Sequence, residues 1–499
     1  MTTTQHSPVQ PVQRTYGMWT RPRNEGLWGL GWAVTMAGFV AIVIAMLAVM
    51  VGGFMAGAVI GVVEIVVLAP MAVRVEGRTG YERGIQMFQW MRTVLRREHL
   101  YAGGVFTKLG SCRLPGLMAD SKLYEDLHSS GVRFGMVHVP AHDLYTVVLR
   151  CWPQGARAVD QAMIDHWVAS WGRLMADLGG APDIEAIIPV IDTMPETGNR
   201  LAAEVTTLTR PDAPVMAKAM MAELQETLPS NTVRLDAWCS VVFRATTPER
   251  RKDPAEQARE IGRRLPGLIA ALGHAGVRAR PMTGDELTAL MRRAWDPAAE
   301  ADLEAAADAD IPHGLTWSDA GPVSYEEHKD RIWHDGTVSV TWEMSAAPEG
   351  NVFEDVLKEL LEPKVEVPRK RVALVFRPHS GADATQIVDS DYKNALMASQ
   401  SARGVVSAHA HLRVGATEQA REEQARGHGV TRFGILITVT EPADGADLPR
   451  VDAIIRDLSV QARLRIRRCY RYQAAAFSAG LGTGILLPEM SSMPRAVAE

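Results

Sequence analysis

The sequence predicts an N-terminal transmembrane α-helical hairpin followed by a cytosolic α+β body with a pseudo-duplicated strand-pair, helix and strand arrangement. Three observations lead to this fold class. Residues 26–73 contain a single charged residue, Glu64. The roughly 425 residues that follow are enough for two or three domains, and 22% charged and 47% hydrophobic residues are values typical of a globular protein. The expected strands and helices of this part also occur twice in the same order.

The apolar stretch is too long to cross a bilayer as one straight helix. At about 1.5 Å per residue it would extend roughly 70 Å, whereas the hydrocarbon core is about 30 Å thick. The clearest break is Val51-Gly52-Gly53. We therefore expect a two-span transmembrane hairpin over residues 27–73, with spans at about 28–50 and 54–73.

The distribution of arginine predicts the orientation of this hairpin. Arginines lie before the first span and after the second, and the turn between them carries no charge. Because positive residues stay on the cytoplasmic side, both termini should be cytoplasmic and the protein should be a multi-pass protein of the cytoplasmic membrane. The flanking arginines are Arg14, Arg21, Arg23, Arg74, Arg78 and Arg83, and Trp19, Trp28 and Trp32 suit the aromatic belt on the same side.

One helical face of the second span carries the candidate site residues Gly53, Gly57, Gly61 and Glu64. The first span offers small residues at Ala37, Ala41, Ala45 and Ala48. One interpretation is that the two faces pack against each other within the hairpin. The alternative is that the glycines and Glu64 face another membrane protein, since an intramembrane carboxyl group is a functional candidate. A single acid provides no proton path.

The body divides into segments of different character. Residues 74–100 form a juxtamembrane amphipathic helix in which Ile85, Phe88, Met91 and Val94 recur at three-residue steps, and which either lies near the membrane or docks onto the body. The complete expected organisation is a cytosolic N-terminal segment (1–26), the hairpin (27–73), this helix (74–100), a first α+β half (101–295), an acidic linker (296–323), a second α+β half (324–475) and a C-terminal tail (476–499).

Matching strands of the two halves are offset by roughly 190–200 residues, a repeat of element order with slight sequence identity. Asp335-Gly336 predicts a tight hairpin in the second half, and Asp253-Pro254 predicts a helix start in the first. The expected strands are 132–139, 144–152, 184–191, 233–243, 277–281, 372–377, 433–440 and 464–472. The expected helices are 158–178, 199–228 (two segments), 254–273, 283–295, 353–361, 384–426 and 449–458.

Composition and cysteine usage exclude several classes of protein. The net charge of -5 is small for 499 residues, so we expect no direct nucleic-acid binding. The four cysteines are Cys112, Cys151, Cys239 and Cys469; they stand far apart without a C-x-x-C pair, which favours reduced thiols over disulfides or a zinc site.

No established catalytic motif occurs in the chain. A Gly-Lys dipeptide is absent, and with it the phosphate-binding Walker A loop, and there is no H-E-x-x-H or G-x-S-x-G. We therefore predict a protein that is not an enzyme, with no catalytic, cofactor-binding or metal-binding residues. Four weaker candidates have simpler explanations. His409 and His411 are better explained as solvated histidines, and the Asp389-Ser390-Asp391 tripeptide as a chance occurrence. The run Gly480, Gly482 and Gly484 is better explained as loop glycines, and the cluster His138, His142 and Asp143 by the chemistry of a turn.

The layout resembles the integral membrane proteins of actinobacterial conjugation loci, which are type IV secretion-like. The resemblance rests on Arg14-Thr15-Tyr16-Gly17, Trp19 and Arg21-Pro22 before the hairpin, and on the segment 144–150, Trp167, Trp171 and the ending 476–488 in the body. The hairpin looks like the small two-pass subunit that partners conjugation ATPases, and the body looks like the ATPase-free N-terminal half of those ATPases. This resemblance implies a structural and assembly role, with a separate secretion ATPase, other membrane subunits and the lipid bilayer as partners.

Two alternatives remain open. The two-pass membrane subunit of a type VII secretion system also carries an α/β body after a hairpin. A membrane-anchored glycosyltransferase-like enzyme using Asp389 and Asp391 is the alternative from another class of protein.

Overall fold

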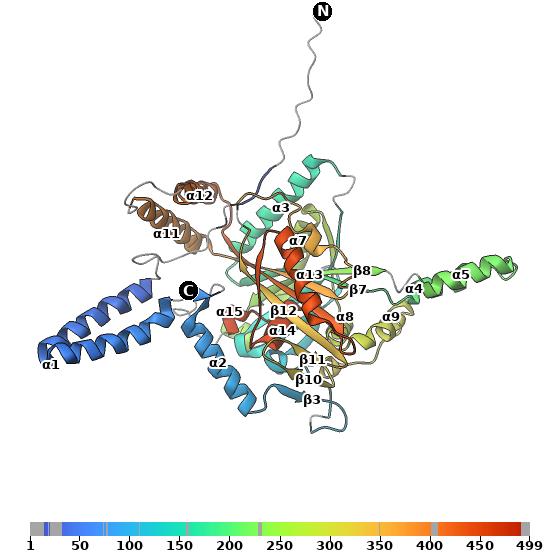
Figure 1. Ribbon diagram of the computed structural model, residues 1–499. Coiled ribbons are helices and arrows are strands. Elements are labelled where there is room, and N and C mark those ends of the chain that lie inside the picture. The colour runs from blue at the N-terminus through green and yellow to red at the C-terminus, as the bar shows by residue number, and fades with distance from the viewer. Residues whose placement is uncertain are drawn as a thin grey trace, which may run out of the picture.

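The computed structural model describes residues 14–17, 19, 32–72, 74–75, 78–108, 110–155, 159–227, 232–348, 350–400 and 408–490. A long apolar helix, α1 (Trp32–Ala72), projects from a body built on a 13-stranded sheet (Figure 1). This arrangement confirms the coarser part of the predicted fold class, an apolar helical segment near the N-terminus followed by an α+β body. Residues 20–31, which include Arg21, Pro22, Arg23 and Trp28, lie outside the described residues.

The two halves of the body form one antiparallel sheet instead of two separate domains. Its strand order is β3-β10-β11-β12-β14-β13-β7-β8-β6-β5-β4, and the halves join where β7 pairs with β13, with Ala373 opposite Val190. The strands from the first half are β3 (Leu100–Ala102), β4 (Lys122–Leu127), β5 (Arg133–Val139), β6 (Leu144–Pro153), β7 (Ile184–Pro195), β8 (Val233–Arg244) and β9 (Val277–Pro281). Those from the second are β10 (Ser324–Glu327), β11 (Ile332–His334), β12 (Thr337–Ala346), β13 (Lys370–Pro378), β14 (Thr431–Pro442) and β15 (Arg465–Arg468).

The two halves arrange their corresponding strands in the same order outward from the β7–β13 pair. β8, β6, β5 and β4 follow one another on one side, and β14, β12, β11 and β10 on the other. β9 pairs with β6 as β15 pairs with β12. One strand breaks the pattern, because β3 is the first strand of the first half but pairs with β10 of the second half.

Helices cover both faces of the sheet. On one face α8 (Gly284–Trp295) and α14 (Gln473–Gly480) pack over both halves, with Trp295 and Phe477 fully buried and 4.6 Å apart between ring centroids. On the other face α3 (Gln161–Gly179) and α7 (Pro254–His274) cover the first half, and α13 (Leu448–Gln461) with α10 (Lys358–Leu361) covers the second. The remaining helices are α2 (Gly80–Leu95), α4 (Asn199–Leu208), α5 (Val215–Thr227), α6 (Pro248–Lys252), α9 (Glu300–Asp308), α11 (Gly381–Gln400), α12 (Ala408–Ala425) and α15 (Leu487–Met490).

Local sequence signals explain where several elements begin. The Asp253 side chain accepts a hydrogen bond from the N–H of Ala255 at 3.0 Å, so it caps α7 as the Asp-Pro pair predicts. Asp335 and Gly336 have φ of 37° and 76°, the left-handed values that a two-residue hairpin turn requires, and they join β11 to β12.

The predicted acidic linker is part of the folded body. α9 lies within it, and Glu300 is only 5% exposed. Glu300 forms an ion pair with Arg234 of β8, and its carboxylate lies 3.6 Å from Arg293 of α8 and 3.9 Å from Arg369 beside β13. The acidic run therefore lies between the two halves, and the Glu300 carboxylate is close to arginines of both.

The predicted C-terminal tail is instead buried in the core up to residue 486 and ends in the short helix α15 (Leu487–Met490). α14 follows β15 as α8 follows β9, and seven of its residues are buried. After Gln473 all of its residues are small or apolar, and the sequence shows no apolar-polar periodicity because both sides of the helix are covered. Residues 491–499 lie outside the described part of the chain.

Other element boundaries differ from the predictions. The expected helix over 353–361 is reduced to α10, and the long helix over 384–426 is two helices, α11 and α12. The expected helix over 74–100 is a short ribbon, β1 (Arg74–Val75) paired with β2 (Arg78–Thr79), followed by α2. Thr79 and Glu82 form a capping box, which explains why α2 begins at Gly80.

Candidate membrane anchor and its junction with the body

α1 has the composition and exposure of a membrane anchor. The most apolar 18-residue window of its stretch Thr35–Pro70 has a mean hydropathy of 2.6, and none of that window is buried in the structure. Within the described ranges it is the one helix long and apolar enough to cross a membrane. Gly53, with φ of 77° and ψ of 177°, interrupts its helical geometry.

The two segments of α1 on either side of Gly53 contact each other. A Cβ atom at Gly57 would overlap the side chain of Val49 and lie 3.4 Å from the carbonyl oxygen of Ala45. Glycine at this position therefore permits close approach of two helical backbones. Ala37, Ala41, Ala45 and Ala48 are also less exposed than most of their neighbours.

The structure does not place the four predicted site residues alike. Gly57 is buried, Gly61 and Glu64 are half-buried, and Gly53 is exposed at the break, where its positive φ takes it out of the helical face. Oε1 of Glu64 is covered and has no hydrogen-bond partner among the described residues. Of the two interpretations of this face, the contact of Gly57 with Val49 and Ala45 corresponds to packing within the chain.

The chain before α1 is attached to the body. Tyr16 forms a β-bridge with Val352, with N···O distances of 2.8 and 2.7 Å in the two directions. Nε of Arg14 lies 3.2 Å from the carboxylate of Asp165, and the ring of Trp19 meets that of Phe433 edge-on at 6.0 Å. Arg14, Tyr16 and Trp19 thus attach the described N-terminal residues to the body.

The chain after α1 is attached to the same body through Arg78. Its guanidinium donates hydrogen bonds to Glu343 at 2.9 Å and to the hydroxyl of Tyr472 at 2.7 Å, and it lies 4.8 Å from the Tyr472 ring centroid. Arg467 also pairs with Glu343 at 2.5 Å. Only 16% of the Arg78 side chain is exposed, so this junction is better shielded from solvent than an ordinary surface ion pair.

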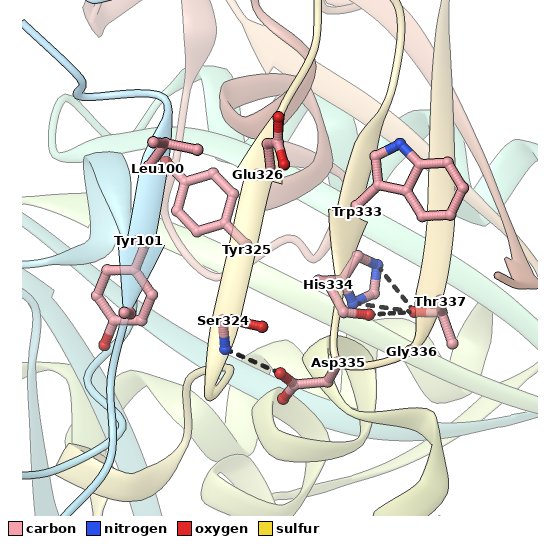
Figure 2. Close-up of a pocket in the computed structure, with 11 residues that line it drawn as sticks. Leu100, Tyr101, Ser324, Tyr325, Glu326, Trp333, His334, Asp335, Gly336 and Thr337 are labelled. Carbon is pink, nitrogen blue, oxygen red and sulfur yellow. Dashed lines mark hydrogen bonds between the residues drawn. The ribbon is translucent and has the colours of Figure 1, made fainter. Parts of the chain in front are cut away.

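A hollow of about 440 Å³ lies at the edge of the sheet formed by β3, β10 and β11 (Figure 2). Its polar groups form hydrogen bonds with the strands around it. The Asp335 carboxylate accepts hydrogen bonds from the backbone N–H groups of Val323 and Ser324, at 2.9 to 3.0 Å. His334 contacts Thr337, Ser339 and the Trp295 carbonyl, and burial lowers its pKa to about 4. These contacts explain both side chains as supports of the β11–β12 hairpin.

The Asp389-Ser390-Asp391 tripeptide lies within α11, and its two acids do not converge. Residues two apart on a helix point in directions about 160° apart. Asp389 pairs with Arg421 of α12 at 2.7 Å, whereas Asp391 is buried. His409 and His411 fall in the first turn of α12, and their side chains lie outside the described residues. No three His, Cys, Asp or Glu side chains in the described part of the chain are close enough to hold a metal ion.

The glycine run after α14 lies flat on the sheet. Gly482 has φ of 72°, and a Cβ atom there would come within 3.2 Å of Ser240 on β8. Gly484 has φ of 101°, and its Cβ atom would lie 2.5 Å from Oγ1 of Thr146 on β6. Backbone conformation and close packing therefore explain these glycines.

His138 and Asp143 also have structural explanations. His138 stacks on Tyr145 at 4.1 Å within the sheet, and burial lowers its pKa. Asp143 has φ of 52° in the turn that follows residues 140–142, a conformation that aspartate tolerates. The cysteines Cys151, Cys239 and Cys469 are buried, and burial raises the pKa of the Cys151 thiol to about 12.

The comparison with known protein families matches only the region around α1. Residues 23–82 match the model of a domain family described as a domain of unknown function, DUF8461. The match covers α1, the β1–β2 ribbon and the first turn of α2, and therefore includes Arg78 and the capping box. A search of curated proteins gave no match.

Proposed function

We propose that this protein is a membrane-anchored structural and assembly component of a bacterial conjugation apparatus of the type IV secretion kind. In this proposal α1 crosses the cytoplasmic membrane twice, and the body docks a separate secretion ATPase in the cytosol. The observation that supports it best is that both flanks of α1 are attached to one folded body, through Tyr16 and through Arg78. A chain that leaves and returns to the same body crosses a bilayer an even number of times.

The dimensions of α1 fit two crossings. The break at Gly53 divides 41 residues into segments of roughly 20, and each would extend about 30 Å, the thickness of the hydrocarbon core. Arginines on both flanks favour a cytoplasmic location for both ends. The conjugation assignment itself rests on the resemblance of the 14–22 element and of the body.

α5 is the surface that we assign to the ATPase. It projects from the side of the body away from α1 (Figure 1). Its apolar side chains Met216, Met220 and Leu224 are 75%, 61% and 42% exposed, and it has no buried residue among those described. α5 contacts the preceding helix α4, where Gln225 donates a hydrogen bond to the Ala202 carbonyl at 3.4 Å, but a helix of 13 residues with so few contacts is marginally stable in water. Methionine-rich faces are suited to binding other proteins, and a partner would stabilise this one.

Co-purification tests the proposal. The tagged full-length protein is extracted from membranes of its native host in mild detergent, and bound proteins are identified by mass spectrometry. We expect the ATPase of a conjugation system, and we expect the double substitution Met216→Ser and Met220→Ser to reduce its recovery. The control is Val460→Ser, which changes a 72% exposed side chain on α13.

Two results would contradict the proposal. Absence of any secretion ATPase would remove the docking role. Recovery of the core ATPase of a type VII system would assign the protein to that system instead.

A further inference from the structure

α2 exposes most of its apolar side chains, whereas most of the half-buried positions on its other side are polar. None of its residues is buried. At about 100° per residue, its exposed apolar side chains fall within about 140° of the helix circumference. They are Tyr81, Met87, Phe88, Met91, Val94 and Leu95, of which Phe88 is 65% and Leu95 is 78% exposed. The half-buried positions include Glu82, Gln86, Gln89 and Thr93, alongside Ile85 and Trp90. A helix on the surface of a water-soluble protein has the reverse orientation.

The first turn of α2 rests against the end of α1. The Tyr81 hydroxyl donates a hydrogen bond to the carbonyl of Val67 at 2.8 Å. A Cβ atom on Gly80 would lie 2.8 Å from the carbonyl oxygen of Pro70, so the two backbones are in close contact. Figure 1 shows α2 leaving the base of α1 and running across the direction of α1, on the side of the body from which α1 projects. When α1 spans a bilayer, α2 therefore runs along its surface.

The charges on α2 suit an anionic surface. Arg92 lies at the margin of the apolar face, and Arg96 and Arg97 follow directly after the helix; all three are exposed. Arg96 has Glu98 as a partner at 3.7 Å, in a pair that is more than half exposed. Basic side chains beside an apolar face are typical of helices that lie in the interface of membranes with anionic lipids.

We propose that α2 is an interfacial helix that inserts Met87, Phe88, Met91 and Leu95 between the headgroups and acyl chains of an anionic bilayer. Together with the Arg78 junction, this contact fixes the orientation of the body relative to the membrane. The inference rests on the proposed insertion of α1.

Depth-dependent fluorescence quenching tests this contact in the full-length protein. Cys112 is replaced by serine; the other three cysteines are buried and stay in place. An environment-sensitive fluorophore is then attached at Met91→Cys. The matched control is Met220→Cys on α5, since these methionines are 51% and 61% exposed. Both proteins are reconstituted into vesicles of phosphatidylglycerol and phosphatidylcholine. Carbonate extraction measures the insertion of α1 separately.

The fluorophore at position 91 should show a blue-shifted emission, lose intensity with a nitroxide-labelled lipid and resist iodide. The fluorophore at position 220 should show the opposite response. If position 91 is quenched by iodide as strongly as position 220 while α1 resists carbonate, the inference is wrong and the proposed anchor stands. Shielding from both quenchers would indicate a protein contact and overturn the lipid assignment. Equal insertion into pure phosphatidylcholine would overturn the anionic preference. Release of α1 by carbonate would overturn both proposals.

Discussion

Replacing Glu300 by glutamine tests whether the acidic run holds the two halves of the body together. Glu300 is 5% exposed and contacts three guanidinium groups, those of Arg234, Arg293 and Arg369. Glutamine keeps the shape of the side chain and removes its charge. The three arginines then share fewer negative charges in a place where water screens them poorly.

The magnitude follows from the partners that remain. Breaking a buried ion pair by removing one charge costs about 3–5 kcal/mol. We expect about 3 kcal/mol, because Glu304 still pairs with Arg234 and Asp236 still lies 2.6 Å from Arg293. For a body of roughly 400 residues the entropy of unfolding is about 0.8 kcal/mol per kelvin, so the melting temperature should fall by about 4 °C.

Thermal unfolding of the purified full-length protein, followed by tryptophan fluorescence, measures this shift. Asp302→Asn is the control, because Asp302 belongs to the same helix and is exposed. We expect the control to change the melting temperature by less than about 1 °C. If Glu300→Gln also stays within about 1 °C of the parent protein, the acidic run does not hold the halves together.

Three further substitutions test other parts of the account. Burial raises the pKa of Glu327 from 4.5 to about 7, although hydrogen bonds from the N–H groups of Ala474 and Gln473 lower it. The folded protein therefore holds this proton more tightly than the unfolded chain, and its stability should fall as the pH rises from 4.5 to 7. Glu327→Gln should remove this loss of stability, so it should stabilise the protein by up to about 3 kcal/mol at pH 8 but not at pH 4. Equal changes in melting temperature at both pH values would contradict this prediction. Gly484→Ala should destabilise the body by about 1–2 kcal/mol, because Gly484 has φ of 101° and the added Cβ atom would overlap Thr146. Gly267→Ala should instead stabilise it by about 0.5–1 kcal/mol, because Gly267 lies within α7 and its Cβ atom would point into open space. Melting temperatures that shift in the same direction would refute that explanation. Arg78→Ala should accelerate amide hydrogen exchange in residues 78–95 by about 10–100-fold, since charged hydrogen bonds contribute about 1.5–3 kcal/mol each. Arg96→Ala, in an exposed pair, should leave exchange unchanged, and an equal response of both variants would show that Arg78 does not hold the junction.

Strong periodic signals allowed much of the body to be predicted. β8 shows its alternation directly in the sequence, and β9 spans the expected residues 277–281. The Asp335-Gly336 turn identifies its hairpin because few dipeptides adopt two left-handed conformations in succession. The apolar stretch around Glu64 likewise identifies α1 by length alone.

Other features depend on contacts between distant residues and were missed. α14 lacks a polar face because it is buried on all sides, so periodicity could not reveal it. The pairing of β7 with β13 joins residues roughly 180 apart, and no local pattern encodes it. Glu300 and Asp302 look alike in an acidic run, although only Glu300 meets the arginines of other elements. The N-terminal element could be noticed as a motif, but its bridge to Val352 required the fold.

The side of the membrane reached by the break in α1 tests the central claim most directly. Val51 is 90% exposed beside Gly53, whereas Val460 is 72% exposed on α13 of the body. Single cysteines at these positions, in a Cys112→Ser background, are treated with a membrane-impermeant maleimide in intact cells and after lysis. Two crossings predict that Val51→Cys is labelled in intact cells and that Val460→Cys is labelled only after lysis. Labelling of both positions only after lysis would contradict the two-span anchor.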